Sequence, residues 1–345
     1  MKSFYPKLVT SLLSIIILPL YAASWEALPH LPPIPADNPQ TEAKILLGKT
    51  LYFDPRLSST GTISCNSCHN LMAGGDDNRP NSVGVAGKQG NRSAPSVWNS
   101  AFLSVQFWDG RANSLEEQAK GPVTNPVEMG IPNWEAVIKR LAAIPGYETL
   151  FKAAFGDNQP LTTDNTVKAI AAYERTLITP NSPYDRYVKG DKTALTEQQV
   201  KGMNTFAELG CTGCHAGPNF SGPSLSMGEG FFMKFPTFAG SQYETQYNLT
   251  KDEGRYSVTQ KEADKNLWRV PTLRNIALTA PYFHNGAVVT LEEAVRVMAK
   301  TQLNQELTDE QLQDIVAFLK ALTGDFPEQS LPRLPSTPGK QIISP

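Results

Sequence analysis

Apolar residues recur along much of the chain at the spacing of a helix with one buried face. In the segment 41–53, Ile45, Leu46 and Leu51 fall on one side, as in an amphipathic helix. Asn133 precedes a similar pattern and is a residue type that caps helix N-termini. Alternation typical of β-strands is scarce. Four segments are therefore predicted to be helical: residues 41–53, 134–141, 163–178 and 308–322.

The clearest of these predicted helices covers residues 308–322. Thr308 is a favoured capping residue, and Asp309 and Glu310 place negative charge in the first turn. Gly324 follows at a position where glycine often ends a helix, so we expect it to be the C-terminal cap. The apolar positions expected on the inner side are Leu312, Ile315, Val316, Leu319 and Leu322. The pattern as a whole predicts a mainly α fold with long loops and little β structure.

The first residues have the pattern of an export signal. Lys2 and Lys7 precede an apolar run over residues 8–20, and small residues follow at 22–24. A positive start, a short apolar stretch and a small-residue exit are typical of a secretory signal peptide. A retained anchor is the alternative, but the run is shorter than the roughly 20 residues needed to span a bilayer. We therefore expect residues 1–23 to be removed on export to the periplasm, leaving a protein without a membrane segment.

Prolines cluster near both ends of the remaining chain. Five of them fall within residues 28–39, and others follow residue 326. Proline-rich segments favour extended conformations over packed elements. We expect solvated tails at both ends, in preference to arms that clasp a second subunit.

Composition and length set the broad class of protein. The chain has 345 residues, of which 40% are hydrophobic and 19% charged, which is enough to form packed cores and too apolar for a disordered chain. A prior of about 150 residues per domain favours two domains. The formal net charge of −2 argues against a basic nucleic-acid-binding protein.

All four cysteines of the chain lie in two short motifs, Cys65–His69 (CNSCH) and Cys211–His215 (CTGCH). This pattern is the attachment signature of c-type haem. Two sulfurs one helical turn apart can form thioethers with the two vinyl groups of one porphyrin, and the following histidine can then ligate the iron. Two covalent haem c groups are therefore predicted, held by Cys65, Cys68 and His69 and by Cys211, Cys214 and His215.

Two other readings of the cysteine pairs are less favourable. A single zinc ribbon usually separates its pairs by about 15–20 residues, much less than the distance from Cys65 to Cys211. Thioredoxin-like redox pairs would suit an oxidising compartment, but they do not require a histidine after each pair. The repeated histidine favours haem attachment.

A weak internal repeat agrees with two haem units. A helical pattern followed by the cysteine motif occurs over residues 44–69 and again over 198–215. The helical pattern breaks at residues 180–191. The predicted organisation has four parts: a signal peptide (1–23), a first haem c domain (24–181), a second haem c domain (182–325) and a proline-rich tail (326–345).

The chain has few residues that could occupy the sixth position of each iron. Besides His69 and His215 it contains His30, expected on the surface, and His284, for which a structural or haem-edge role is favoured over ligation. Both irons therefore cannot have two histidine ligands. An iron with an open face can react with a small molecule, whereas one ligated on both faces transfers electrons. Methionine is the other candidate ligand, and spacing alone does not choose among Met227, Met233 and Met298.

At this point the sequence strongly resembles the bacterial dihaem cytochrome c peroxidases. The likeness extends from about residue 42 to residue 324. Its most specific pieces are Phe107–Arg111 (FWDGR), Glu117–Pro122 (EQAKGP), Val127–Met129 (VEM) and Pro271–Ile276 (PTLRNI) with the following TAPYFHNGAV. The resemblance implies two cytochrome c-like domains, with a low-potential peroxidatic haem in the first and a high-potential electron-entry haem in the second.

The resemblance also implies roles for individual residues. Met298 matches the sixth ligand of the second haem, and Trp108 matches the tryptophan between the haems. Glu128 matches the distal glutamate that relays a proton between the peroxide oxygens, and Gln118 matches a nearby distal glutamine. A calcium ion between the domains would be held partly by backbone oxygens of Thr279 and Pro281.

Two positions depart from the family pattern. Val85 stands where most members carry a histidine that blocks the peroxidatic iron until the second haem is reduced, and valine cannot ligate iron. Ser93 stands where the family has a calcium-binding asparagine, although Asn91 is close in sequence. We expect a first haem that is open in the oxidised protein and a weakened calcium site.

The expected function is reduction of hydrogen peroxide to water with electrons from a small redox protein, such as a cytochrome c or a cupredoxin. The resemblance also implies a homodimer. A non-enzymatic dihaem electron carrier and a dihaem oxidase acting on a partner protein are the alternatives. Related cofactor-maturing oxidases also lack the blocking histidine, but they have tyrosine where this chain has Met298.

Overall fold

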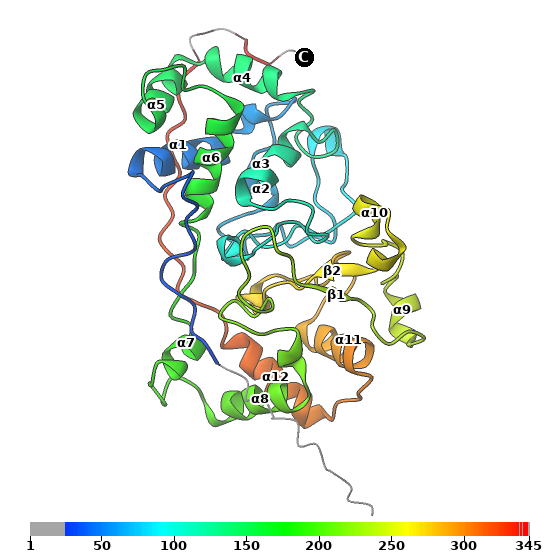
Figure 1. Cartoon of the computed structure of the whole chain (residues 1–345). Coiled ribbons are helices and arrows are strands. Elements are labelled where there is room, and N and C mark those ends of the chain that lie inside the picture. Colours follow the sequence, from blue (N-terminus) through cyan, green and yellow to red (C-terminus); the bar gives the residue numbers. More distant parts are fainter. Residues whose placement is uncertain (1–24, 338, 340, 344–345) are drawn as a thin grey trace, which may run out of the picture.

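The computed structural model describes residues 25–337, 339 and 341–343, and the predicted signal peptide lies outside them. Helices dominate these residues (Figure 1). The α-helices are α1 (Glu42–Phe53), α2 (Cys65–Cys68), α3 (Leu115–Thr124), α4 (Trp134–Ala142), α5 (Pro145–Phe155), α6 (Thr163–Glu174), α7 (Pro183–Val188), α8 (Glu197–Glu208), α9 (Gln242–Gln246), α10 (Tyr256–Thr259), α11 (Leu291–Leu303) and α12 (Asp309–Lys320).

Short elements complete the architecture. One-turn 3₁₀ helices are η1 (Pro55–Leu57), η2 (Val85–Gly87), η3 (Ser100–Phe102), η4 (Cys211–Gly213), η5 (Glu262–Asp264) and η6 (Ile276–Leu278). The strands β1 (Phe232–Lys234) and β2 (Leu267–Arg269) pair antiparallel, with Met233 opposite Trp268. The prediction of a mainly α fold with little β structure is confirmed.

Each half of the chain has a helix pair in close contact and its own hydrophobic core. The helix α1 packs on α6, and α8 packs on α12. A glycine permits each close approach: a Cβ at Gly48 would lie 1.8 Å from the carbonyl oxygen of Ala169, and one at Gly202 would lie 1.8 Å from that of Asp314. The core clusters draw on residues 47–177 in the first half and 184–322 in the second. The division at residues 181/182 stays a prediction.

The internal repeat is wider than the sequence pattern indicated. Asn99 and Asn275 both adopt a left-handed backbone before a 3₁₀ turn, and Phe107 and Phe283 share a positive φ of 67° and 71°. Isolated bridges then pair Gln106 with Ala112 and Tyr282 with Val288, and α3 and α11 follow. The same number of residues separates the two members of every pair. The two halves therefore share one loop and helix plan.

Three details of the predicted helices need correction. In α1 the buried hydrophobic residues are Leu47, Leu51 and Tyr52, whereas Leu46 is 53% exposed. The helix α6 ends at Glu174 rather than at residue 178. The cap at Thr308 is confirmed, but α12 ends at Lys320 and Gly324 is not its cap. A Cβ at Gly324 would lie 1.9 Å from the carbonyl oxygen of Thr179, so this glycine permits a close contact between segments.

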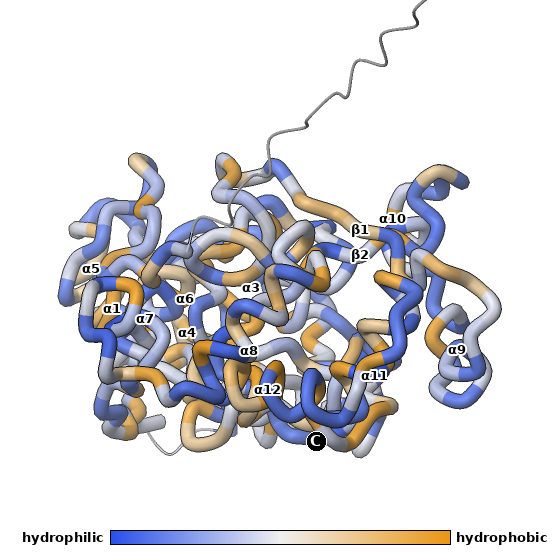
Figure 2. Tube along the Cα trace, turned by 90° about the horizontal axis from the view of Figure 1, so that it is seen from below, coloured by the Kyte–Doolittle hydropathy of each residue, from blue (hydrophilic) through white to orange (hydrophobic). Residues whose placement is uncertain are grey.

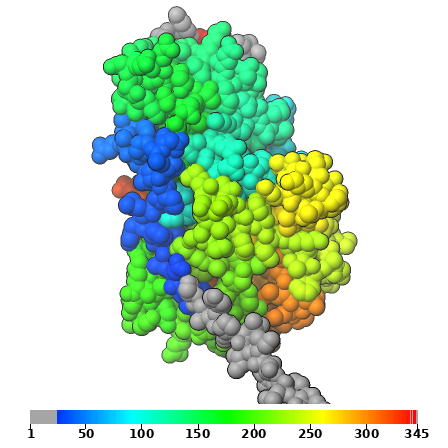
Figure 3. Space-filling view, viewed as in Figure 1, coloured from blue at the N-terminus to red at the C-terminus, as the bar shows by residue number. Residues whose placement is uncertain are grey.

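The N-terminal segment is packed, and the expectation of a solvated tail is wrong there. The Trp25 ring lies against Tyr184, Phe220 and Phe318, with centroid distances of 6.0–6.3 Å. Leu28 is 1% exposed. The segment 25–40, which we call the N-terminal arm, thus runs from the second core to α1 on the first (Figures 1 and 3).

The C-terminal segment is also packed on the body of the molecule. Phe326 meets Trp98 edge-on at 4.9 Å, and the hydroxyl of Tyr173 donates to Gln329 over 2.9 Å. The guanidinium of Arg56 donates to the carbonyl oxygen of Pro335 over 2.8 Å. This segment therefore returns from α12 to the first half, beside the N-terminal arm (Figure 1). Both ends tie the halves of one chain together.

Apolar and polar residues are interspersed along the tube (Figure 2). Within the part of the chain that the structure describes, no helix is long and apolar enough to cross a membrane.

The packing of the arm yields a stability prediction. Replacing Trp25 by alanine removes an aromatic ring from the second core, so Trp25→Ala is expected to cost about 2–3 kcal/mol of unfolding free energy. Leu31→Ala in the same arm is the control, because Leu31 is 75% exposed. Thermal and denaturant unfolding of the two variants measure the difference. Equal stability of both variants would contradict the packed position of the arm.

Candidate functional site

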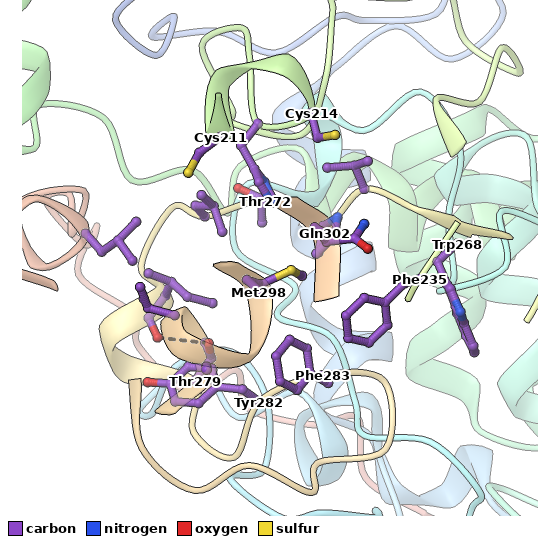
Figure 4. A pocket seen from close by; sticks show the side chains of 18 of the residues that line it. Cys211, Cys214, Phe235, Trp268, Thr272, Thr279, Tyr282, Phe283, Met298 and Gln302 are labelled. Carbon is purple, nitrogen blue, oxygen red and sulfur yellow. Dashed lines mark hydrogen bonds between the residues drawn. The ribbon is translucent and has the colours of Figure 1, made fainter. Parts of the chain in front are cut away.

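A cavity of about 300 Å³ lies beside the second cysteine motif and is lined mainly by the second half of the chain. We call it the second cavity, after that motif. Cys211, Cys214 and His215 line it, together with Met298. Figure 4 shows the Met298 sulfur directed into the pocket, with the two cysteines across from it. Its walls are mostly apolar and aromatic, including Phe235 and Trp268. This arrangement fits a haem attached at the cysteines and ligated from the opposite side.

The structure narrows the choice among the three methionines. Met227 is 46% exposed and does not line the cavity. Met233 on β1 and Met298 on α11 both line it. The helix α11 is anchored by buried residues, with its N-terminus capped by Thr290, so it presents Met298 from a well-packed element. Assignment of Met298 as a ligand stays a prediction that this placement supports.

Each motif histidine is oriented by a backbone carbonyl. The Nδ1 atom of His69 lies 2.9 Å from the carbonyl oxygen of Pro95, and that of His215 lies 3.1 Å from the carbonyl oxygen of Phe220. Burial lowers the pKa of both imidazoles. A neutral ring that donates from Nδ1 leaves Nε2 free as a metal ligand. Both histidines therefore have the arrangement of a proximal ligand.

The surroundings of the cysteines argue against the other two readings. Burial raises the pKa of Cys68 to about 11 and that of Cys211 to about 12, whereas a reactive redox pair needs a lowered thiol pKa. No group of three or more His, Cys, Asp and Glu side chains among the described residues could hold a metal ion. Haem attachment is the reading that the residues fit.

Trp108 lies where the two halves meet. It lines the second cavity, and its indole N–H donates to the carbonyl oxygen of Ser93 over 2.9 Å. Pro95 also lines this cavity while its carbonyl faces His69 of the first motif. The loop 93–95 of the first half thus contacts both cysteine–histidine sites, and Trp108 is hydrogen-bonded to this loop.

Glu128 and Val85 lie side by side in the first half. The backbone N–H of Val85 donates to the carbonyl oxygen of Glu128 over 2.9 Å, and Val85 is 4% exposed. A Cβ at Gly84 would lie 2.0 Å from the carbonyl oxygen of Val127, so only glycine permits this approach. The predicted distal residue and the position of the missing histidine are thus brought together.

The carboxyl group of Glu128 is partly withdrawn from water. Burial raises its pKa, although nearby Arg111 and a hydrogen bond from Asn125 act in the opposite direction. The amide nitrogen of Asn125 donates to Glu128 Oε1 over 2.8 Å. The sequence analysis did not identify Asn125, although it precedes a proline in the segment that positions Glu128. Gln118 lies half-buried on α3.

The shared plan of the two halves shows how their sites differ. In the repeat, Trp108 takes the place of His284, and Pro122 of α3 takes the place of Met298 of α11. Proline has no ligating side chain. The first half therefore lacks a methionine at the equivalent helix position and a histidine at Val85.

His284 has surroundings that the sequence did not reveal. It is 2% exposed, lines the second cavity and stacks on Trp268 with centroids 4.1 Å apart. Arg92 lies over the other ring of this pair, 4.9 Å from the Trp268 centroid. Burial lowers the pKa of His284 to about 4. This placement agrees with the predicted structural or haem-edge role. His30 is exposed, as expected.

The calcium prediction gains no support from side chains. Thr279 and Pro281 lie on the wall of the second cavity near Asp76, whose pKa burial raises to about 6. The hydroxyl of Ser93 donates to a backbone carbonyl of the chain, and Asn91 is exposed. Calcium binding through the backbone oxygens of Thr279 and Pro281 stays a prediction.

Comparisons with known proteins agree with this geometry. A family model described as di-haem cytochrome c peroxidase matches residues 42–193. The cytochrome c551 peroxidase of Nitrosomonas europaea is 46% identical over 330 residues, which covers 95% of each chain. That of Pseudomonas aeruginosa is 44% identical over 301 residues, covering 87% of this chain and 84% of its own.

A solved structure gives the same result for the fold. The crystal structure of a MauG-like protein associated with microbial copper homeostasis matches with a TM-score of 0.75 at 30% identity, over 92% of this chain and all of that one. The relatives extend over nearly the whole described chain and both cysteine motifs. This chain belongs to the di-haem cytochrome c peroxidase family and is an enzyme of that class.

Proposed function

We propose that this chain is a periplasmic peroxidase that reduces hydrogen peroxide to water with electrons from a small redox protein, a cytochrome c or a cupredoxin. The observation that carries the proposal is the difference between the halves: Met298 projects into the second cavity, whereas Pro122 and Val85 provide no ligand in the first. One centre is thus suited to accept electrons and the other to bind a small substrate. Relatives named cytochrome c551 peroxidase support it.

The residues that would hold the cofactors follow from the two centres. Cys65 and Cys68 would attach the first haem c and His69 would ligate its iron. Cys211 and Cys214 would attach the second, with His215 and Met298 as ligands. When bound, the first haem supplies the site at which peroxide is reduced, and the second supplies a store for one electron.

Side chains of the protein transfer the protons and carry the electrons between the two haem sites. The Glu128 carboxylate takes a proton from one peroxide oxygen and returns it to the other, so that the departing oxygen leaves as water. Asn125 holds this carboxylate in place through its amide, and Gln118 helps to orient the substrate. Trp108, bonded to the loop that contacts both centres, carries electrons between them. Two electrons and two protons convert one peroxide into two water molecules.

The ligand assignment can be tested by a matched pair of methionine variants. Met298→Leu is expected to remove the sixth ligand of the second iron, which becomes high-spin and falls in reduction potential. Met233→Leu alters the same cavity wall and is expected to leave spin state and potential unchanged. Electron paramagnetic resonance and potentiometric titration measure both. The reverse pattern would assign Met233 as the ligand.

The role of Glu128 has a kinetic and a pH signature. Glu128→Gln is expected to lower peroxide turnover by about 10²–10⁴-fold, because the amide cannot accept the proton. Glu117→Gln on the exposed side of α3 is the control, since an amide oxygen can still accept from the Asn113 N–H. Unchanged turnover in Glu128→Gln would contradict the mechanism and favour an electron carrier.

The pH profile follows from the direction of the Glu128 pKa. The carboxylate acts when deprotonated, so turnover falls as the pH drops through this pKa. Because burial raises the pKa, the acidic limb is expected above pH 4.5, the ordinary value for glutamate. The limb should be absent from the residual activity of Glu128→Gln. Steady-state rates between pH 4 and 8 measure it.

The valine at position 85 predicts a peroxidase that needs no prior reduction. The oxidised protein is expected to show a high-spin or water-bound first haem and to react with peroxide at once. Val85→His is expected to make this haem low-spin and to introduce a requirement for pre-reduction, whereas Val85→Ala keeps the open form. Electron paramagnetic resonance and stopped-flow mixing test this. A low-spin first haem in the unmodified protein would contradict the prediction.

A further inference from the structure

Arg274 is a fully buried charged side chain beside the second cavity. It pairs with Asp185 at 2.9 Å, and both side chains are 0% exposed. Arg274 is one of the residues that line the cavity, whereas Asp185 is not. It also lies over the rings of Tyr184 and Phe220, about 5 Å from each centroid. A buried ion pair of this kind is weak evidence for stability alone.

The guanidinium of Arg274 fixes the loop that follows the second motif. Its Nε and Nη2 atoms both donate to the carbonyl oxygen of Pro218, over 2.8 and 2.6 Å. Its third nitrogen, Nη1, donates to the hydroxyl of Ser182 over 3.1 Å. Two residues beyond Pro218, the carbonyl of Phe220 faces Nδ1 of His215. The carbonyl group that Arg274 binds is therefore only two residues away from the carbonyl group that orients His215.

A second segment is bound into the same assembly. The carbonyl of Pro271 also acts on His215, opposing the effect of burial on its pKa. The hydroxyl of Thr272 donates to the carbonyl oxygen of Asn219 over 2.7 Å, and the backbone N–H of Arg274 donates to this hydroxyl. The segments that carry the two carbonyls facing His215 are thus held together through Thr272 and Arg274.

The first half has no such charge at the equivalent place. Pro95 and Pro271 are equivalent in the repeat, and Trp98 takes the position of Arg274. Trp98 is 1% exposed and packs edge-on against Phe326. The equivalent position is therefore taken by an aromatic ring in the first half and by a guanidinium with directed hydrogen bonds in the second.

The N-terminal arm completes the surroundings of Asp185. The backbone N–H of Leu28 donates to Asp185 Oδ1 over 2.9 Å, and the other carboxylate oxygen accepts from Ser182. Trp25 packs on Phe220 of the loop itself. Leu28 and Ser182 thus hold Asp185 in place, and this fixes the guanidinium in turn.

We propose that Arg274 is a positioning residue for His215: it locks the loop whose carbonyl bonds to His215 Nδ1, and so sets the orientation and donor strength of this ligand and the reduction potential of the second haem. The proposal rests on the function proposed above, in which His215 ligates that haem. A hydrogen bond at Nδ1 fixes the ring and makes the imidazole a stronger donor to the metal.

The test uses Arg274→Lys in the full-length holoprotein. Lysine keeps the positive charge but lacks the planar fork, so it cannot hold Pro218 and Asp185 together. We expect the low-spin resonance of the second haem to broaden or split and its potential to move upward, because a looser Nδ1 contact weakens the histidine as a donor. The spectrum of the first haem should stay unchanged.

The matched control is Arg175→Lys in the first half. Arg175 also uses two guanidinium nitrogens, which bind the two carboxylate oxygens of Glu116 over 2.7 and 3.0 Å, and its side chain is 2% exposed. This variant also loses a buried guanidinium with two hydrogen bonds. It is expected to lower the melting temperature without altering the resonance or the potential of the second haem. If Arg274→Lys lowers only the melting temperature, with resonance and potential unchanged, Arg274 supports the fold alone and the proposal is overturned.

A second variant keeps the test decisive where Arg274→Lys does not fold. Asp185→Asn retains the guanidinium and the shape of its partner but removes the charge that fixes it, and the same changes confined to the second haem are expected. An unchanged resonance and potential in folded Asp185→Asn overturns the proposal. The unmodified protein separates a failure of the proposed function from a failure of this inference. Absence of a low-spin second haem in it refutes the proposed function. A low-spin second haem whose resonance and potential the variants leave unchanged refutes only the role of Arg274.

Discussion

In both halves of the molecule, the histidine after the cysteine pair is partly buried and turns Nδ1 to a backbone carbonyl, 2.9 Å away at Pro95 and 3.1 Å away at Phe220. An unpaired polar group at this depth would be costly, so a loop must bring a carbonyl to the ring. Much of the architecture serves this requirement. The packed helix pairs form a rigid support on which the motif and its carbonyl-bearing loop can be held together.

In the proposed function, the different roles of the two halves follow from a few substitutions on one plan. The helices α3 and α11 occupy equivalent places, but one carries Pro122 where the other carries Met298. The loops before them are also equivalent, and Trp108 stands in one where His284 stands in the other. Under that proposal, the same loop and helix plan serves one site suited to electron storage and one suited to a small substrate. The shared fold supplies the geometry, and single side chains decide its use.

Local features of this fold were predictable from the sequence because they depend on near neighbours. The caps at Asn133 and Thr308 and the helical character of the chain follow from capping chemistry and periodicity. The two motifs likewise identify their chemistry through residues that are adjacent in sequence. The resemblance to a family added Trp108, Glu128 and Met298, which periodicity alone would have assigned to the core or the surface.

Features set by distant contacts could not be predicted in this way. The residues around Gly324 in the sequence do not reveal whether this glycine caps a helix or permits a close approach to Thr179. Proline-rich segments are extended whether they are solvated or packed, so the burial of Leu28 was not visible. Arg274 bonds to Pro218, a partner 56 residues away that only the fold brings near.

The contact between Trp25 and Phe318 joins positions near opposite ends of the described chain. Contacts with such large sequence separation form slowly, because a long loop must close before they contribute. The N-terminal arm can pack on the second core only after α12 has been synthesised and folded. Residues near the start of the described chain are therefore among the last to reach their final place.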